Sequence, residues 1–221
     1  MSSPTSTRAP RLRVSEIFAS VQGESTRIGL PTVFVRLTGC PLRCVWCDTE
    51  YAFSGGEQRS LDDIVDAVRS HGLNTVCVTG GEPLAQKDCL PLLQRLCDEG
   101  FSVSLETSGA LDIAAVDPRV SRIMDLKAPG SGECERNRWD NLPLLCARDE
   151  IKIVLNGEQD YAWAREQITR HRLHQRCTVL LSPVHGQLAA TDLAEWIVRD
   201  RLPVRFQLQL HKILWHDARG R

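Results

Sequence analysis

The chain has 221 residues, of which 42% are hydrophobic and 25% charged, so it can enclose one sizeable core, and we expect one domain over residues 12–215. Lys and Arg number 27 against 28 Asp and Glu, a balance that argues against a nucleic-acid binder or an electrostatic membrane anchor. No apolar run approaches the roughly 20 residues needed to span a bilayer, and nine cysteines without an apolar leader indicate a reducing compartment; we expect a cytoplasmic protein with a small-molecule partner.

The elements alternate along the chain between strands and helices. Residues 1–11 are polar, basic and proline-containing, and predict a disordered lead-in. Ser60 is a good N-cap for a helix in which Leu61, Ile64, Val65 and Val68 follow helical spacing. Runs rich in Val, Ile, Leu and Phe predict strands at 33–37, 75–79, 102–106, 122–126, 150–155, 178–181 and 204–210, and further helices are predicted at 90–97, 161–171 and 193–200. Repeated β/α units favour a parallel sheet, and therefore an α/β barrel, complete or partial.

Five chemically distinctive segments follow predicted strands. They are "GCPLRCVWC", "TGGEP", "ETSG", "DLKAPGSG" and "SPVHG". In barrels of this kind the reactive residues gather at the carboxyl ends of the strands, where the β-to-α loops open. The sequence therefore predicts one site, built from these loops. The tail at 216–221 is polar, and its length argues against a role of the chain's end in the pocket.

Cys40, Cys44 and Cys47 have the spacing CxxxCxxC. A structural zinc site would need a fourth Cys or His, and residues 21–70 contain none. A disulfide with a spare thiol does not suit a reducing compartment, and three small buried hydrophobes would not explain the neighbouring Gly39, Pro41 and Asp48. The remaining interpretation is a 4Fe-4S cluster with three protein thiolates and one iron open to a non-protein ligand.

This motif resembles the CxxxCxΦC signature of the radical S-adenosylmethionine (SAM) superfamily, with Trp46 at the aromatic position. The resemblance implies that SAM chelates the open iron and is cleaved reductively to a 5'-deoxyadenosyl radical. "TGGEP" resembles the superfamily loop that receives the SAM amino group through backbone carbonyls and the Glu82 carboxylate. The implied SAM-binding residues are Trp46, Cys47, Asp48, Gly80, Gly81, Glu82, Lys127, Ser131, Ser182, Pro183, Val184 and His185.

A second resemblance covers nearly the whole chain. "EIFASVQGES", "FVRLTGC" and "CVWCDT" resemble the 7-carboxy-7-deazaguanine synthase family of the queuosine and deazapurine pathway, which serves tRNA modification. The resemblance implies a partial (β/α)6 radical SAM barrel with parallel strands. It also implies a lyase that contracts 6-carboxy-5,6,7,8-tetrahydropterin to 7-carboxy-7-deazaguanine with loss of ammonia. The reaction would start with hydrogen abstraction from C6 of the pterin and reuse SAM.

The resemblance also assigns the substrate residues. A carboxylate at Glu24 offers acceptors to the ring N–H and amine of a pterin, and the Arg36 fork offers donors to a carboxylate or ring oxygen. By themselves, Glu24 would be read as a solvated loop residue and Arg36 as half of a salt bridge. The full implied set is Val21, Gln22, Gly23, Glu24, Arg36, Thr79 and His211, with His211 approaching from the last strand.

Thr49 matches the family's Mg²⁺ ligand, a hydroxyl oxygen for a hard ion. As the only protein ligand it would bind Mg²⁺ firmly only with substrate present; without the resemblance, "DT" reads as a helix cap.

The resemblance further implies a homodimer and an electron donor such as flavodoxin or ferredoxin. Two rival functions stay open: a radical SAM activase that makes a glycyl radical on a partner protein, and a noncatalytic iron–sulfur or zinc module.

Overall fold

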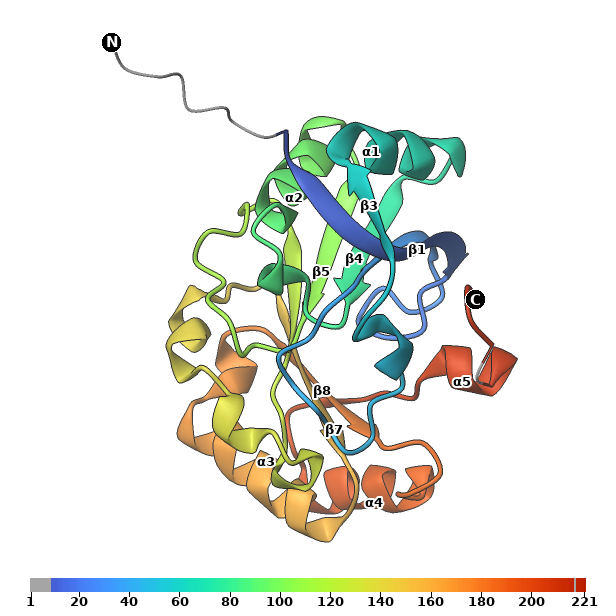
Figure 1. Ribbon diagram of the computed structural model, residues 1–221. Helices are drawn as coiled ribbons and strands as arrows, with labels where there is room; N and C mark the ends of the chain where they lie inside the picture. Colours follow the sequence, from blue (N-terminus) through green and yellow to red (C-terminus); the bar gives the residue numbers. More distant parts are fainter. Residues whose placement is uncertain (1–8, 217) are drawn as a thin grey trace.

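The computed structural model describes residues 9–216 and 218–221, so most of the predicted lead-in lies outside the described residues. Within them, nine strands form one sheet in the order β3-β1-β2-β4-β5-β6-β7-β8-β9. From β2 to β9 every neighbouring pair is parallel, whereas β1 pairs antiparallel with both β2 and β3. The sheet curves without closing, so the predicted partial α/β barrel is confirmed (Figure 1).

The elements follow the predicted order. The strands are β1 Arg11–Val21, β2 Pro31–Leu37, β3 Glu57–Ser60, β4 Thr75–Gly80, β5 Ser102–Thr107, β6 Ser121–Asp125, β7 Glu150–Leu155, β8 Thr178–Pro183 and β9 Arg205–Phe206. The α-helices are α1 Leu61–Ser70, α2 Cys89–Asp98, α3 Glu158–Arg170, α4 Ala190–Asp200 and α5 Leu210–Trp215. Among the described residues no helix is both long and apolar enough to cross a membrane.

Side chains along each parallel strand point alternately to the two faces of the sheet, which separates the hydrophobic core from the site. On β7, Ile151, Ile153 and Leu155 are fully buried in the hydrophobic core, whereas Lys152 and Val154 line the central cavity on the other face of the sheet. This follows from the two-residue period of a strand, which turns successive side chains to opposite faces. The apolar layer beneath the helices therefore holds the sheet, and the inner face is left for polar side chains.

The helices form where the periodicity predicted them. Ser60 caps α1 in a reciprocal capping box with Asp63. The predicted apolar face of α1 is buried in the core, and burial of each such Val, Leu or Ile side chain contributes about 1.5–3 kcal/mol. α1 packs near β1 and β2, α2 near β5, α3 near β7 and α4 near β8, which places these helices on the outside of the curved sheet (Figure 1).

Three local expectations were incomplete or wrong. The strand predicted at 204–210 is reduced to β9, because the chain turns after Phe206 and begins α5 at Leu210. The strands β1 and β3 were not predicted; β1 lies between β3 and β2, and it alternates only partly between buried and exposed positions. Between β6 and β7 the chain forms 3-10 turns where a regular β/α unit has an α-helix.

Candidate functional site

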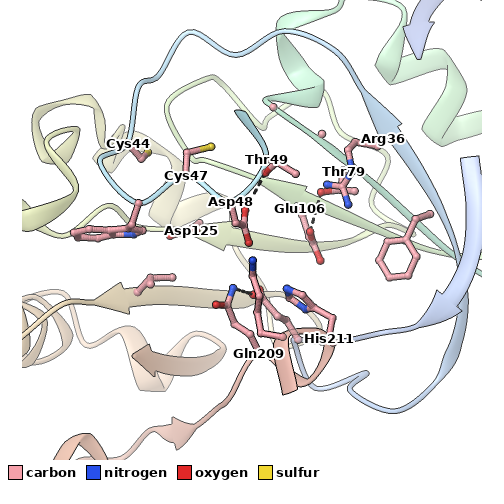
Figure 2. A pocket seen from close by; sticks show the side chains of 18 of the residues that line it. Arg36, Cys44, Cys47, Asp48, Thr49, Thr79, Glu106, Asp125, Gln209 and His211 are labelled. Carbon is pink, nitrogen blue, oxygen red and sulfur yellow. Dashed lines mark hydrogen bonds between the residues drawn. The ribbon is translucent and has the colours of Figure 1, made fainter. Parts of the chain in front are cut away.

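The loops at the carboxyl ends of the parallel strands surround a central cavity of about 760 Å³. Figure 2 shows cysteines on one side of it, Arg36 and Thr79 on another, and His211 reaching in from the C-terminal segment. Of the residues predicted for the site, those lining the cavity are Val21, Gln22, Gly23, Glu24, Arg36, Cys40, Cys44, Trp46, Cys47, Asp48, Thr49, Thr79, Gly80, Gly81, Lys127, Val184, His185 and His211. Those outside its lining are Glu82, Ser131, Ser182 and Pro183.

The cysteine-bearing loop, residues 38–49, leaves β2 and is held from several sides. The Val45 amide donates to the Ser131 carbonyl at 3.0 Å, and the Arg43 amide donates to the Glu133 carboxylate at 2.5 Å. The Arg43 guanidinium donates to the carbonyl of Cys40 at 2.8 Å and lies over the Phe53 ring at 4.3 Å. These contacts fix the cysteine-bearing loop to the segment that follows β6 and to Phe53.

The "TGGEP" turn presses directly against this loop. The Gly81 amide donates to the Leu37 carbonyl at 3.2 Å, and the Glu82 amide donates to the Gly39 carbonyl at 2.8 Å. A Cβ on Gly81 would lie 2.4 Å from the Gly39 carbonyl oxygen and 2.8 Å from Cys40 Cβ. No side chain fits in that space, which explains why a glycine stands there.

The three motif thiols suit a cluster better than a single ion. All three line the cavity and are free thiols. Three thiolates and no fourth Cys or His nearby in the sequence are the donor set of a 4Fe-4S cluster with one open iron. Burial raises the pKa of the Cys40 and Cys44 thiols, while the nearby Lys127 ammonium acts in the opposite direction.

Lys127 supplies a lasting positive charge beside this loop. Its Nζ lies 3.0 Å from the Asp125 carboxylate. Burial lowers the pKa of an ammonium, but Asp125 outweighs it and the pKa of Lys127 is raised. Asp125 was not singled out from the sequence; its second oxygen is buried without a partner among the described residues. Such an oxygen is an acceptor left for a ligand in the cavity.

Glu82 makes mainly structural hydrogen bonds within the protein. Its side chain is fully buried and accepts from the Thr107 hydroxyl at 3.0 Å and from the Ser108 amide at 2.7 Å, tying "TGGEP" to "ETSG". Its part in receiving the SAM amino group stays a prediction. The Ser131 hydroxyl donates to the Ala128 carbonyl at 2.6 Å, whereas the buried Ser182 hydroxyl has no partner among the described residues.

The loop between β1 and β2, residues 22–30, forms the other wall. It is tied across the sheet, with Thr26 bound to Glu150 and Glu24 bound to Lys152. Gly23 touches the C-terminal segment: its carbonyl accepts from the Leu210 amide at 2.9 Å, and a Cβ here would meet His211 Nδ1 at 2.3 Å. The predicted substrate residues Gly23 and His211 are thus neighbours, although His211 lies on α5 and not, as predicted, on a strand.

The Arg36 guanidinium is anchored through one nitrogen, and its other nitrogens remain for a ligand. Its Nε donates to Glu16 Oε1 at 2.7 Å, and the Tyr51 hydroxyl donates to the same oxygen at 2.9 Å. The guanidinium lies 5.9 Å from the ring centroids of Phe18 and Tyr51. Burial, and next the hydrogen bond to Glu16, raise the pKa of Tyr51 to about 12, so its hydroxyl stays a donor at neutral pH. The salt bridge expected of Arg36 by itself therefore coexists with a place in the cavity wall.

Several lining residues were not among those predicted from the sequence. Glu106 accepts from the Thr79 hydroxyl at 2.8 Å and from the Gln22 amide at 3.4 Å, and Gln209 donates to Glu24 at 2.7 Å. Lys152 stands on β7 between Ile151 and Ile153. A charged residue at an inward position of a buried strand is the signal that sequence reasoning had available.

Asp48 and Thr49 form a pair of hard oxygens at the cavity wall. The Thr49 hydroxyl donates to Asp48 Oδ1 at 3.0 Å (Figure 2). Burial raises the pKa of Asp48, but the Lys152 charge and the Thr49 hydroxyl outweigh it, so the pKa is lowered and the carboxylate is ionised. Carboxylate and hydroxyl oxygens are the donors that Mg²⁺ prefers, so the pair fits such an ion once other oxygens join it. Thr49 does not act as a side-chain cap for the following turn.

The C-terminal tail takes part in the cavity, contrary to expectation. His216, Ala218, Arg219, Gly220 and Arg221 are among its lining residues. The Arg219 guanidinium lies over the Tyr51 ring at 4.2 Å, a distance typical of a cation–π contact. The tail therefore narrows the opening on the side of Tyr51 and Arg36.

The comparisons with known proteins agree with this geometry. A family model described as the radical SAM superfamily matches residues 34–129. A 7-carboxy-7-deazaguanine synthase of Chlorobaculum tepidum is 49% identical over 97% of this chain and 99% of its own, and one of Koribacter versatilis is 42% identical over 92% and 97%. The crystal structure of QueE from Escherichia coli superposes with a TM-score of 0.75 at 26% identity, over 91% of this chain and 95% of that one.

Proposed function

Because the chain belongs to the family of the 7-carboxy-7-deazaguanine synthases, which are radical SAM enzymes, we propose that it converts 6-carboxy-5,6,7,8-tetrahydropterin to 7-carboxy-7-deazaguanine. Ammonia is released, and the enzyme acts as a lyase in queuosine biosynthesis. The match over nearly the whole length of both chains supports this, because the residues outside the cysteine motif are included in it.

One observation carries the proposal. The three motif thiols and the polar set of Glu24 and Arg36 line the same cavity, whose volume of about 760 Å³ is large enough for a cofactor and a bicyclic substrate together. A glycyl-radical activase would share the thiols but would have no use for two side chains suited to a pterin. The shared cavity therefore favours the pterin reaction over the two rival functions.

The chain's residues fit the implied cofactors. Cys40, Cys44 and Cys47 would hold three irons of a 4Fe-4S cluster, and the backbone at Gly81 with the Lys127 charge would hold SAM beside it. When bound, the cluster and SAM supply the carbon-centred radical that takes a hydrogen atom from the substrate.

The proposed roles of Glu24 and Arg36 follow from their free hydrogen-bonding capacity. Each Glu24 oxygen accepts one bond from the protein, to Lys152 and to Gln209, and keeps a further lone pair for the pterin N–H groups. Arg36 spends its Nε on Glu16, and its two terminal nitrogens suit the substrate carboxylate or ring oxygen. Held at both ends, the pterin presents one edge to the thiol side of the cavity.

Asp48 and Thr49 are proposed to receive Mg²⁺ together with the substrate carboxylate and water. The ionised Asp48 contributes negative charge and Thr49 a neutral oxygen. Two protein oxygens are too few for a tightly held ion, so binding of the metal and of the substrate should depend on each other. The ion would orient the carboxylate and neutralise charge.

The tail and the outer rim suit the remaining roles. Arg219, stacked on Tyr51, would restrict water from the substrate side. Val45 of the cysteine loop is 71% exposed, so a protein electron donor such as flavodoxin or ferredoxin can approach the cluster from outside. A homodimer, implied by the family resemblance, and a cytoplasmic location, indicated by the nine cysteines, complete the proposal.

The decisive experiment is anaerobic turnover by the reconstituted protein. It is supplied with SAM, a reductant, Mg²⁺ and 6-carboxytetrahydropterin, and the products are identified by mass spectrometry. We expect 7-carboxy-7-deazaguanine and ammonia in equal amounts, and neither from a variant with the three motif cysteines replaced by alanine. SAM cleavage without any deazaguanine would refute the proposed substrate while leaving the radical SAM assignment intact.

A further inference from the structure

Strand β7 holds the substrate loop at two points. Glu150 and Lys152 lie two residues apart, so their side chains leave the same face of the strand. The Glu150 carboxylate accepts from the Thr26 hydroxyl at 2.5 Å and from its amide at 2.9 Å. Lys152 Nζ donates to Glu24 Oε2 at 2.5 Å. Residues more than 120 positions apart in the chain are thereby fixed to each other on the inner face of the sheet.

The Lys152 ammonium stands among carboxylates at the cavity wall. Besides Glu24, it lies 3.5 Å from Asp125 Oδ2, and Glu106 and Asp48 act on it electrostatically. Its side chain is only 14% exposed. Burial alone would lower the pKa of such an ammonium, but Glu24 and Asp125 outweigh burial and the pKa is raised well above the ordinary value. Lys152 is thus a permanent cation facing the site.

The Glu24 carboxylate depends on Lys152 for the balance of its charge and for its orientation. The carboxylate is buried, with one oxygen on Lys152 and the other on the Gln209 amide. Gln209 is neutral, so Lys152 alone among these two partners balances the charge. A buried carboxylate without a balancing charge is unfavourable, and turning away to solvent relieves that cost. Such a change removes acceptors that a pterin's adjacent N–H groups require.

We propose that Lys152 is a positioning residue for the pterin, which balances the charge of the Glu24 carboxylate and keeps it directed into the cavity. The inference rests on the proposed pterin role of Glu24. A purely structural ion pair is the alternative, but a buried pair is a weak source of stability by itself. Moreover, both partners line the cavity, whereas structural pairs such as Arg122 with Asp149 lie outside its lining.

The test compares Lys152→Met and Lys152→Arg with Arg122→Met in cluster-loaded protein. The probe is 6-carboxypterin, the oxidised form of the proposed substrate, titrated anaerobically; SAM affinity and the urea midpoint are measured on the same samples. We expect Lys152→Met to weaken probe binding by about tenfold or more, and Lys152→Arg to recover most of it. Arg122→Met removes a cation of similar burial, and we expect it to lower the urea midpoint with unchanged probe affinity.

A double variant, Glu24→Gln with Lys152→Met, separates the two levels of the proposal. It removes both charges of the Glu24–Lys152 pair, so it should regain part of the stability that Lys152→Met loses, while its probe affinity stays as weak as that of Glu24→Gln alone. If Glu24→Gln binds the probe like wild type, the pterin role of Glu24 fails. If Glu24→Gln is impaired but Lys152→Met is not, or if Arg122→Met is impaired equally, the positioning role of Lys152 is overturned.

Discussion

Replacing Arg36 by lysine tests whether the planar guanidinium group is needed to bind the anionic end of the substrate. The guanidinium, 16% exposed, donates through Nε to Glu16 Oε1 at 2.7 Å, which fixes its plane and leaves two nitrogens for the substrate. Lysine keeps the charge but has one compact head group, which cannot bind Glu16 and present a planar fork at the same time. The variant therefore loses about one charge-assisted hydrogen bond to the substrate, worth about 1.5–3 kcal/mol.

At 1.4 kcal/mol for each factor of ten, this loss corresponds to roughly 10- to 150-fold weaker pterin binding. Anaerobic titration of the reconstituted protein with 6-carboxypterin measures it, with SAM affinity and iron content determined in parallel and expected to be unchanged. Arg59→Lys is the matched control, because Arg59 pairs with Glu57 at 3.2 Å on the exposed surface. An Arg36→Lys variant that binds the pterin within twofold of wild type would refute the reasoning.

Four further results are expected. Alanine in place of any one motif cysteine should abolish the 4Fe-4S absorbance, whereas Cys97→Ala on α2 should retain it. Thr49→Ala should lower turnover and flatten its Mg²⁺ dependence with SAM affinity unchanged, and calorimetry should show wild-type Mg²⁺ affinity rising when pterin is bound. Gly81→Ala places a Cβ 2.4 Å from a carbonyl oxygen of the cysteine loop, and should reduce iron content and cost about 1–3 kcal/mol in urea unfolding. Asp149→Asn leaves Arg122 buried without its charge partner, 2.6 Å away in the wild type, and should cost about 3–5 kcal/mol at neutral pH.

The Asp149–Arg122 pair should make the stability of the protein depend on pH in a defined direction. Burial raises the pKa of Asp149, but hydrogen bonds from Arg122 outweigh it, so the folded-state pKa lies below the ordinary 3.8. A lowered carboxyl pKa contributes stability above the unfolded-state value and loses it as pH falls through the folded-state value. Wild type should therefore lose stability below about pH 4, and Asp149→Asn should lose less over the same range.

Each expectation has an opposing outcome. Equal cluster loss in Cys97→Ala would remove the distinction of the three motif cysteines. Wild-type Mg²⁺ dependence in Thr49→Ala would leave that hydroxyl without a metal role. Full iron loading in Gly81→Ala would show that the cysteine loop can move away from "TGGEP". An Asp149→Asn variant as stable as wild type at neutral pH would mean that the pair contributes nothing net.

Much of the fold was readable because local patterns agree with the tertiary structure. β7 spans residues 150–155 as predicted, and α1 begins at its capping box. The prediction for 204–210 failed because apolar residues at alternate positions do not distinguish a strand from a turn leading into a short helix. β1 went unpredicted because many of its residues are only partly buried, which weakens the alternation.

The sequence by itself determined the chemistry of the site, because the cysteine spacing and the loop motifs are local and each follows its own strand. The tertiary structure alone decided which charges meet: Lys152 with Glu24, Glu16 with Arg36 and Asp125 with Lys127. Lys152 and Glu24 lie 128 positions apart in the chain. Long-range pairing depends on strand order and on which face each strand turns inward, and no local pattern contains that information. The tail entered the cavity for the same reason, since the path of α5 beside Gly23 sets its direction.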